Sequence, residues 1–473
     1  MRLRLALAAA AAGVTAFQLS RPGELFGATA DISVYLGSGV RLVHGALPYR
    51  DFDFVQPSAI TLLSAPFAAL SEWIGTRDAL VVVRLCTLLL AALSVLLVGR
   101  VMSRRGAGAT AVACAVMAIF PAQLYALQDG MLEPLMSVLC LAGVALVFDG
   151  DDVNTSTRTL TVAGTMFGMA AAIKLPALLP GAVLLVVLLA SARAKAAWLG
   201  GGALLAFALP NLPFIVAAPG SWFRDVVAAQ LMRIPSSARV PLGDRVDAVL
   251  GSANLRPLAI VALLAVVLVL AAAYAGARRP SPLEWFALSS LVLLAAAQLL
   301  PAQYYPQYAA FLTPFLAIAL GCATPRIIAR ARLIGSGLVA APVLALAAGA
   351  GLMLYDESAP DVSSTVDAVI PARACALSDS PKYLVTSDRF VSDRSDCPLL
   401  VDPFGTTLAR GVDTPAAHAF WRDVFARVDY VVSDRPVERW YIGSDAVLVQ
   451  SVHTQFHELR RGPLLFYVRS GAQ

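Results

Sequence analysis

The sequence predicts a mostly α-helical membrane protein: a polytopic bundle of about eleven transmembrane helices followed by a small α/β domain outside the cytoplasm. Three observations lead to this fold class. Eleven apolar segments are long enough, or nearly long enough, to cross a bilayer; arginines gather in alternate loops between them; and the hydropathy pattern changes after residue 354. We therefore expect a membrane domain at 1–354 and an extracytoplasmic domain at 355–473.

The composition excludes a soluble globular protein. Hydrophobic residues make up 58% of the 473 residues, charged residues only 14%, and the mean hydropathy is +0.73. This apolar surface exceeds what one soluble core can hide, so the remainder must face lipid. The predicted spans cover residues 5–20, 79–99, 108–127, 132–148, 159–173, 176–191, 197–218, 257–275, 283–300, 306–323 and 333–354.

The arginines indicate the orientation of these spans. If the end that carries Arg2 and Arg4 is cytoplasmic, every other arginine-rich short loop also falls on the cytoplasmic side, as the positive-inside rule requires. The chain is then a multi-pass protein of the cytoplasmic membrane, with outer regions at 21–78, 219–256 and 355–473. The apolar stretch 57–73 is expected to be a juxtamembrane or re-entrant helix, because counting it as a span would invert all later loops.

The C-terminal region alternates short β-prone runs with turn residues. The runs lie at 383–385, 399–401, 430–432 and 464–468, with one helical stretch near 415–428. This mixture predicts a small α/β domain. Cys375 and Cys397 are its only cysteines, and in an oxidising compartment we expect them to form a disulfide. The other four cysteines lie in apolar runs, and no Cys/His cluster indicates a metal site.

Polar residues are densest in the first outer region. Asp31 lies just beyond the first span and begins an amphipathic helical stretch that ends near His44. A turn with the sequence Gly-Ala-Leu-Pro-Tyr-Arg-Asp-Phe follows, and Gln56-Pro57 then leads into the apolar helix.

This arrangement resembles the C superfamily of integral-membrane glycosyltransferases. The resemblance rests on the early outer-loop acid, the short helix with its Pro-Tyr-Arg-Asp-Phe turn, the Gln-Pro step and the many spans, and its architecture covers about residues 1–330. Members such as protein O-mannosyltransferases, lipid A aminoarabinose transferases and actinobacterial mannosyl- and arabinosyltransferases use polyprenyl-phosphate sugars. The resemblance implies that Asp31 is the general base that takes the proton of the acceptor hydroxyl.

The neighbours of Asp31 depart from the superfamily pattern. Many members have a second acid beside the first, whereas Ala30 and Ile32 flank Asp31 here. The sequence therefore indicates no certain cofactor and leaves a divalent metal open. A helix N-cap is the structural alternative for Asp31, and the two roles are compatible. Asp51 and Asp53 are rival acids, expected on the same side of an extended segment, although a solvated turn also explains them.

Two further candidates lie at the outer ends of later helices. Glu133 or Asp129 matches the acid that the superfamily commonly carries in its second outer loop, and Glu133 lies at the membrane boundary, where an ionisable group is costly. Helix capping is the alternative for both. Lys174 lies between two apolar runs with no room for a loop, so we expect it to bind the lipid-linked phosphate or to snorkel to lipid headgroups.

The remaining candidates would bind the donor. Arg224 and Arg233, in the middle outer region, suit bidentate pairing with phosphate oxygens, unless that region is an amphipathic helix resting on anionic headgroups. Tyr304, Tyr305 and Gln307 could line a sugar or prenyl-phosphate pocket or belong to an interfacial aromatic belt. Further candidates for substrate binding are His44 and Gln56.

The predicted function is transfer of a sugar from a polyprenyl-phosphate carrier to a glycan, lipid or protein acceptor on the outer face of the membrane. Membrane lipids are expected partners and nucleic acid is not. A transporter or lipid flippase would instead place charges near the bilayer midplane and show internal repeats. A cell-envelope assembly protein without catalysis is the third alternative. The sequence leaves the sugar, the acceptor and the oligomeric state open.

Overall fold

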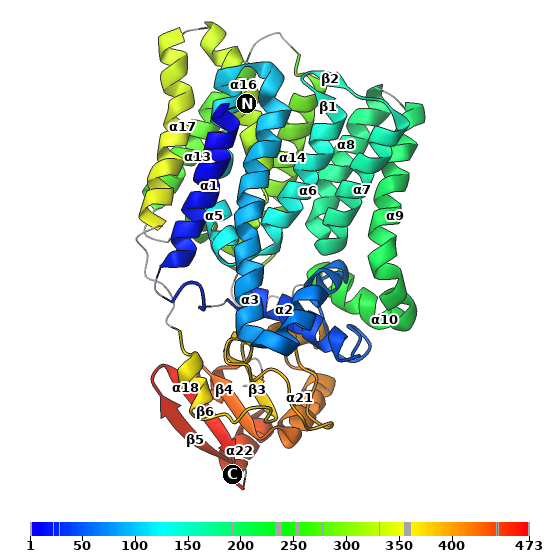
Figure 1. Cartoon of the computed structure of the whole chain (residues 1–473), viewed down its shortest axis with the longest axis vertical. Coiled ribbons are helices and arrows are strands. Elements are labelled where there is room, and N and C mark those ends of the chain that lie inside the picture. The colour runs from blue at the N-terminus through cyan, green and yellow to red at the C-terminus, as the bar shows by residue number, and fades with distance from the viewer. Residues whose placement is uncertain are drawn as a thin grey trace. The chain divides into compact units, whose positions relative to one another are not determined.

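The computed structural model describes residues 2–21, 23–27, 29–191, 193–231, 239–250, 256–275, 279–330, 332–353, 361–440, 442 and 444–471. The chain folds as two compact units, whose elements are labelled in Figure 1. The helical unit comprises Met1–Ser20, Arg84–Pro210 and Ala238–Glu357. The mixed unit comprises Arg21–Val83, Asn211–Ser237 and Ser358–Gln473.

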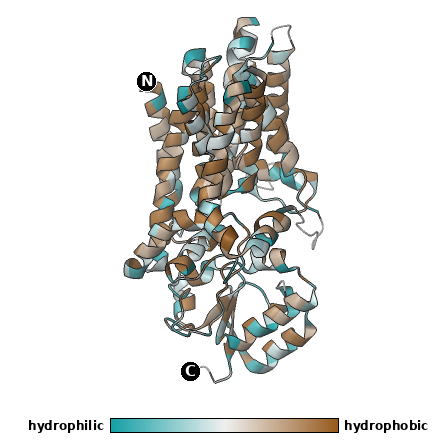
Figure 2. Ribbon diagram, turned by 90° about the vertical axis from the view of Figure 1, so that its right-hand side faces the viewer, coloured by the Kyte–Doolittle hydropathy of each residue, from teal (hydrophilic) through white to brown (hydrophobic). Residues whose placement is uncertain are grey.

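The helical unit is a bundle of apolar helices that run alongside one another (Figure 1). Leu204 exposes 69% and Val292 64% of its surface, and the helices are largely apolar along their length (Figure 2). Aliphatic surface on this scale would be costly in water, so these faces meet lipid. The elements are α1 (Arg2–Ser20), α4 (Ala107–Ile119), α5 (Pro121–Gln128), α6 (Leu132–Val147), β1 (Phe148–Asp149), β2 (Asp152–Val153), α7 (Thr157–Ile173), α8 (Leu178–Ser191), α9 (Arg193–Ala217), α12 (Leu242–Val249), α13 (Arg256–Tyr274), α14 (Pro282–Gln298), α15 (Pro306–Ala310), α16 (Thr313–Arg330) and α17 (Arg332–Met353).

The predicted spans are helical over most of their length. Within the described residues, six helices are long and apolar enough to cross a bilayer, and there are seven if α4 and α5, bent by 49° at their junction, form one span. Three shorter apolar helices lie at Leu132–Val147, Leu175–Ala190 and Pro282–Gln298. The multi-pass helical architecture is thus confirmed, and eleven is an approximate count.

Close backbone packing fixes the position of α7. A Cβ atom at Gly164 or Gly168 would come within 2.1 Å of a backbone oxygen of α9, and one at Gly202 of α9 within 2.3 Å of a backbone oxygen of α7. Glycines one turn apart let the two helices approach this closely. α7 ends at Ile173, because Pro176 lacks the N–H for another turn and restricts the residue before it.

The mixed unit contains a four-stranded sheet in the order β3-β4-β6-β5, with β3 parallel to β4 and the other pairs antiparallel. Its core is built around aromatic residues that include Trp421, Phe425 and Trp440. A disulfide joins Cys375 to Cys397, with their Cα atoms 5.6 Å apart, as expected from the sequence. The elements are α2 (Ala30–Val43), the start of α3 (Ala59–Met102), α10 (Pro219–Trp222), a π-helical turn (Phe223–Ala228), α11 (Ala229–Leu231), α18 (Ser363–Asp367), β3 (Ala376–Ser378), α19 (Lys382–Val385), α20 (Pro403–Arg410), α21 (Pro415–Arg427), β4 (Tyr430–Ser433), α22 (Ala446–Gln455), β5 (Phe456–Arg461) and β6 (Leu464–Arg469).

A break inside α3 separates two helical segments. Gly75 has φ +86° and ψ 159°, a conformation that glycine adopts without strain. The segment before it corresponds to the helix expected at 57–73, so this stretch is distinct from the span that begins near residue 79. The carboxylate of Asp388 accepts hydrogen bonds from Thr76 Oγ1 and the Arg77 backbone N–H, both at 3.0 Å, and so caps the second segment.

Two of the four predicted β-prone runs are not strands. Residues 383–385 form α19, because Pro381 presets a helical first turn. Residues 399–401 are irregular, and the prolines at 398 and 403 around them cannot donate to a strand ladder. Strands β3 and β5 were not predicted; β5 is an edge strand whose polar, mostly exposed residues lack an apolar alternation.

Candidate functional site

A buried ion pair lies where α7 gives way to α8 in the helical unit. Lys174 is the extended residue between α7 and the 3-10 turn Leu175–Ala177, and its Nζ donates to Glu133 Oε1 at 2.6 Å. The two side chains expose only 12% and 3% of their surface. Glu133 lies in the first turn of α6, where backbone N–H groups without helical partners favour an acid. Its Oε2 is buried and has no hydrogen-bond partner among the described residues.

Two tyrosines extend this polar group to a second cation. Lys174 Nζ is 5.1 Å from the ring centroid of Tyr308, and the rings of Tyr308 and Tyr304 pack edge-on with centroids 5.8 Å apart. The guanidinium carbon of Arg245 lies 5.5 Å from the Tyr304 ring centroid. Burial raises the pKa of Tyr304 to about 12, so its hydroxyl stays protonated and donates to Gln298 Oε1 at 3.1 Å.

Arg245 is a buried cation held by backbone oxygens. Its side chain donates to the carbonyl oxygens of residues 240, 298, 301 and 302, the second at 2.8 Å, and the residue exposes 5% of its surface. No carboxylate forms an ion pair with it in the described part of the chain, so its charge suits an anion. Arg224 and Arg233, rather than Arg245, were the phosphate-binding residues predicted for this region. Arg233 lies outside the described residues.

A third buried cation anchors the turn before α6. Arg84 of α3 is fully buried; its Nε donates to the Gln128 carbonyl at 3.2 Å, and its Nη2 lies 3.6 Å from Asp129. The side chain of Gln128 accepts a hydrogen bond from Gln18 of α1 at 3.0 Å. Of the two acids proposed for the second outer loop, Asp129 is thus engaged with Arg84 and Glu133 with Lys174. Arg84 was not singled out from the sequence.

Tyr305 and Gln307, the other two residues predicted to line a substrate pocket before α16, differ in solvent exposure. Tyr305 is 37% exposed and packs its ring against Tyr308 with centroids 5.7 Å apart. Gln307 is buried on α15 and exposes 6%. The structure therefore brings Glu133, Lys174 and Tyr304 into one polar group, which we call the Lys174 site, together with Tyr308 and Arg245.

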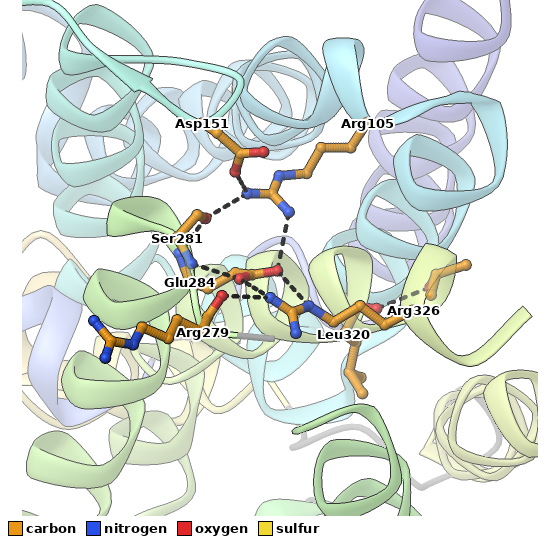
Figure 3. Close-up of polar contacts among 8 residues, drawn as sticks. Arg105, Asp151, Arg279, Ser281, Glu284, Leu320 and Arg326 are labelled. Carbon is orange, nitrogen blue, oxygen red and sulfur yellow. Dashed lines mark hydrogen bonds and ion pairs between the residues drawn. The ribbon is translucent and has the colours of Figure 1, made fainter. Parts of the chain in front are cut away.

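The other end of the helical unit contains a charge-balanced cluster (Figure 3). The carboxylate of Glu284 on α14 accepts hydrogen bonds from Arg105 at 3.1 Å and from Arg326 at 3.0 and 2.7 Å. Arg105 also pairs with Asp151, and Glu284 forms a capping box with Ser281. In α3, Arg84 lies next to Asp129, four residues before Glu133 in the sequence, and the helix ends at Met102, three residues before Arg105. At about 1.5 Å per residue, roughly 30 Å separates the two ends.

The predicted base, Asp31, belongs to the mixed unit. It lies in the first turn of α2, and the N-cap position that was its structural alternative is held by Thr29. Residues 32–40 of α2 are buried. A Cβ at Gly37 would lie 2.8 Å from the ring of Phe390, and Arg41 stacks over the same ring at 4.6 Å. The C-terminal segment therefore holds the helix that carries Asp31.

Asp53 joins three stretches of the mixed unit. Its Oδ1 accepts from Arg224 at 2.7 Å and from Arg410 at 3.1 Å, and its Oδ2 accepts from Arg410 at 2.5 Å. Asp225 accepts from Arg224 at 2.7 Å and from the Phe54 N–H at 3.2 Å, and burial raises the pKa of Asp225 to about 6. Guanidinium groups thus occupy both oxygens of Asp53, an arrangement suited to holding loops together.

The other first-loop candidates take local structural roles. Asp51 does not share a side with Asp53, because residues 47–51 form a turn in which exposed Asp51 accepts from the Leu47 N–H at 2.7 Å. His44 is the C-cap residue of α2. The backbone oxygen of Gln56 accepts a tyrosine hydroxyl at 2.6 Å. Within the described residues, no three His, Cys, Asp or Glu side chains gather where they could hold a metal ion.

The sequence matches the model of glycosyltransferase family 87 over residues 54–301, about half of the chain. The chain belongs to glycosyltransferase family 87. It is therefore a multi-pass membrane glycosyltransferase. The two alternative functions, a transporter and a non-catalytic assembly protein, are rejected. Glu133, Lys174 and Arg245 lie inside the matched residues, and Asp31 lies before them. No curated protein matches the sequence.

The glycosyltransferase also resembles solved structures along nearly its whole length. ArnT from Cupriavidus metallidurans bound to undecaprenyl phosphate has a TM-score of 0.59 at 14% identity, covering 99% of this chain and 98% of that chain. Its apo form has a TM-score of 0.58 at 14% identity, covering 94% and 95%. The archaeal oligosaccharyltransferase AglB from Archaeoglobus fulgidus, in complex with an inhibitory peptide and a dolichol-phosphate, has a TM-score of 0.54 at 11% identity, covering 99% and 74%. This likeness, with the family match, confirms the predicted C-superfamily fold.

Proposed function

We propose that this glycosyltransferase moves a sugar from a polyprenyl-phosphate carrier to an acceptor hydroxyl on the outer face of the cytoplasmic membrane. The Lys174 site carries the proposal, because it sets two cations and two tyrosines at one end of an apolar helical bundle. A polyprenyl phosphate has an anionic headgroup on a long apolar tail, which such a helix end can accommodate. The solved complexes of ArnT with undecaprenyl phosphate and of AglB with a dolichol-phosphate support this class of carrier.

Lys174 and Arg245 are assigned to the phosphate of the donor. An ammonium has three N–H donors, so Lys174 can keep its hydrogen bond to Glu133 and still donate to a phosphate oxygen. Within the described residues, Arg245 donates hydrogen bonds to carbonyl oxygens, lies over the Tyr304 ring and forms no ion pair, so its positive charge is available to an anion. Negative charge grows on the phosphate as its bond to the sugar breaks, and both cations would stabilise it in the transition state.

Asp31 is assigned as the general base. The acceptor oxygen forms a bond to the anomeric carbon, the bond from that carbon to the phosphate oxygen breaks, and the acceptor proton passes to the Asp31 carboxylate. A single base on the face opposite the leaving phosphate gives inversion at the anomeric carbon. Glu133 and Asp53 are the alternative bases; Glu133 pairs with Lys174, and Asp53 pairs with Arg224 and Arg410.

The distribution of charge supports an outer location for the reaction. The arginines that pair with Glu284 lie at helix ends that the positive-inside rule assigns to the cytoplasm. The Lys174 site lies at the other end of the same helices, and its polar residues would then face the outer leaflet.

The proposal is tested by sugar transfer in nanodiscs. The purified full-length protein would receive synthetic polyprenyl-phosphate donors carrying mannose, arabinose, glucose or galactose, with an extract of envelope glycans and lipids as acceptor source. We expect one donor to lose its sugar with release of polyprenyl phosphate, Lys174→Met to abolish this release, and Lys195→Met to leave it unchanged. Lys195 is a matched control, because it is one of only three lysines and is exposed on α9. Release from no donor, or full activity of Lys174→Met, contradicts the proposal.

A further inference from the structure

The mixed unit contains a cavity of about 230 Å³ that none of the assigned roles uses. Its walls come from residues 26–27, 361–362, 382–383, 386, 434 and 463–464, several of which are distant in sequence. One buried water needs about 15 Å³ of such volume, so the cavity has room for a ligand of many atoms. All of these walls belong to the mixed unit, so the cavity is complete within one compact unit.

The cavity wall is preorganised by hydrogen bonds and stacking. The Tyr383 hydroxyl donates to Asp434 Oδ2 at 3.1 Å, and Arg435 Nε lies 3.4 Å from the other oxygen of Asp434. Two other wall residues are held by Arg77, which donates to Asp361 at 2.7 Å and stacks over the Phe26 ring at 4.5 Å. These contacts hold the carboxylates and aromatic rings in place before a ligand arrives, which lowers the entropic cost of binding.

Lys382 is the cation of the cavity that has no carboxylate partner among the described residues. Its Nζ lies 4.8 Å from the Tyr383 ring centroid, so the ammonium is held over an aromatic face. Asp434 also lines the cavity and offers a carboxylate acceptor, and the Thr386 hydroxyl, which donates to the Lys382 carbonyl at 2.7 Å, can accept a hydrogen bond. The wall thus offers one strong donor, one strong acceptor and two aromatic rings.

The charges around the cavity balance. Arg435 also donates to the buried carboxylate of Asp379 at 3.0 Å, so Lys382 and Arg435 are matched by Asp379 and Asp434. Because the Arg77 and Asp361 charges cancel as well, neither an anion nor a cation finds a net attractive field. Charged groups in the wall also disfavour a purely apolar ligand, since they would lose their hydration without a hydrogen-bond partner.

We infer that this cavity is a binding site for an uncharged saccharide. Sugar hydroxyls donate to carboxylates and accept from an ammonium, and the weakly positive C–H face of a sugar ring packs on the negative face of an aromatic ring. The site binds the glycan without reacting with it. Its assignment to the acceptor glycan, rather than to another sugar polymer, rests on the proposed function.

The test is saccharide binding to the full-length protein in nanodiscs. Saturation-transfer NMR would measure the binding of neutral disaccharides of mannose, arabinose, glucose and galactose, with inorganic phosphate as the anionic probe. We expect at least one disaccharide to bind and phosphate not to compete with it. Lys382→Met and Asp434→Asn should each weaken binding by roughly tenfold or more, as loss of a hydrogen bond to a charged group does.

Matched controls separate this site from the Lys174 site. Lys195→Met and Arg460→Met replace exposed cations elsewhere and should bind the disaccharide like the wild type. Lys382→Met should bind free polyprenyl phosphate with wild-type affinity. Saccharide binding at the cavity and phosphate binding at the Lys174 site can therefore fail independently, and the experiment distinguishes the two failures. Lys382 is partly exposed and its replacement should leave the fold intact, which tryptophan fluorescence checks. Binding of no disaccharide, competition by phosphate, or wild-type affinity in Lys382→Met overturns the inference.

Discussion

Substitutions that remove one or both charges of the Lys174–Glu133 ion pair test whether Lys174 stabilises the fold, binds the donor phosphate, or does both. Lys174→Met leaves Glu133, only 3% exposed, without its 2.6 Å partner. Losing one partner of a buried pair costs about 3–5 kcal/mol, because the remaining charge is uncompensated, whereas removing both charges is often nearly neutral. We therefore expect Lys174→Met alone to lower the free energy of unfolding by about 3–5 kcal/mol, and Lys174→Met with Glu133→Gln to recover most of it.

The double variant should recover its stability but not its affinity for the donor phosphate. If Lys174 holds the phosphate, the double variant is stable but binds polyprenyl phosphate much more weakly than the wild type. Unfolding in mixed micelles and titration with polyprenyl phosphate measure the two quantities on the same preparations. The exposed Lys195→Met variant should change stability by less than about 0.5 kcal/mol. Wild-type phosphate binding by the stable double variant would refute the role of Lys174, and an unchanged stability of Lys174→Met alone would refute the buried pair.

Three further changes test other parts of the structure. Glu284→Gln removes the carboxylate that Arg105 and Arg326 share, although Arg105 keeps its ion pair with Asp151, so the free energy of unfolding should fall by about 3 kcal/mol while polyprenyl-phosphate binding at the other end of the bundle is kept. Burial raises the pKa of Asp225 from 3.8 to about 6, so the native state binds more protons than the unfolded state in this range and stability falls as the pH rises through it, by roughly 3 kcal/mol. Tryptophan fluorescence should show that Asp225→Asn flattens this dependence and that exposed Asp393→Asn does not. Replacing Cys375 and Cys397 by serine should lower the stability of the sheet in the mixed unit by about 2–4 kcal/mol in a chemical denaturation experiment.

The membrane architecture could be predicted because its signals are local in sequence. A bilayer favours spans that are apolar helices with internally satisfied backbone groups, and arginines in alternate loops indicate the orientation of these helices without any knowledge of tertiary contacts. The disulfide between Cys375 and Cys397 could also be predicted, since the C-terminal region contains no other cysteine. Lys174 stood out for the same reason, as a charge between two apolar runs with no loop around it.

Residues whose role depends on distant partners could not be predicted. Arg245 was one of several arginines in its region, and its distinguishing partners are carbonyl oxygens at 298–302, more than fifty residues away. Asp53 was expected to face the same side as Asp51, but the turn at 47–51 and two arginines from other stretches separate them. The cavity beside Lys382 likewise combines several stretches of chain, none of which carries a motif.

Transfer from a polyprenyl phosphate with Asp31 as base is tested most directly by the turnover of Asp31→Asn. The substitution keeps size and hydrogen bonding but removes the basic carboxylate, so kcat should fall by about 10²–10⁴-fold while polyprenyl-phosphate affinity and folding stay near wild type. Asp53→Asn and Glu133→Gln, assayed beside it with the donor that the wild type uses, should retain more turnover. Near wild-type turnover of Asp31→Asn with a dead Asp53→Asn or Glu133→Gln would place the base elsewhere, and activity in all three variants would contradict carboxylate-assisted glycosyl transfer.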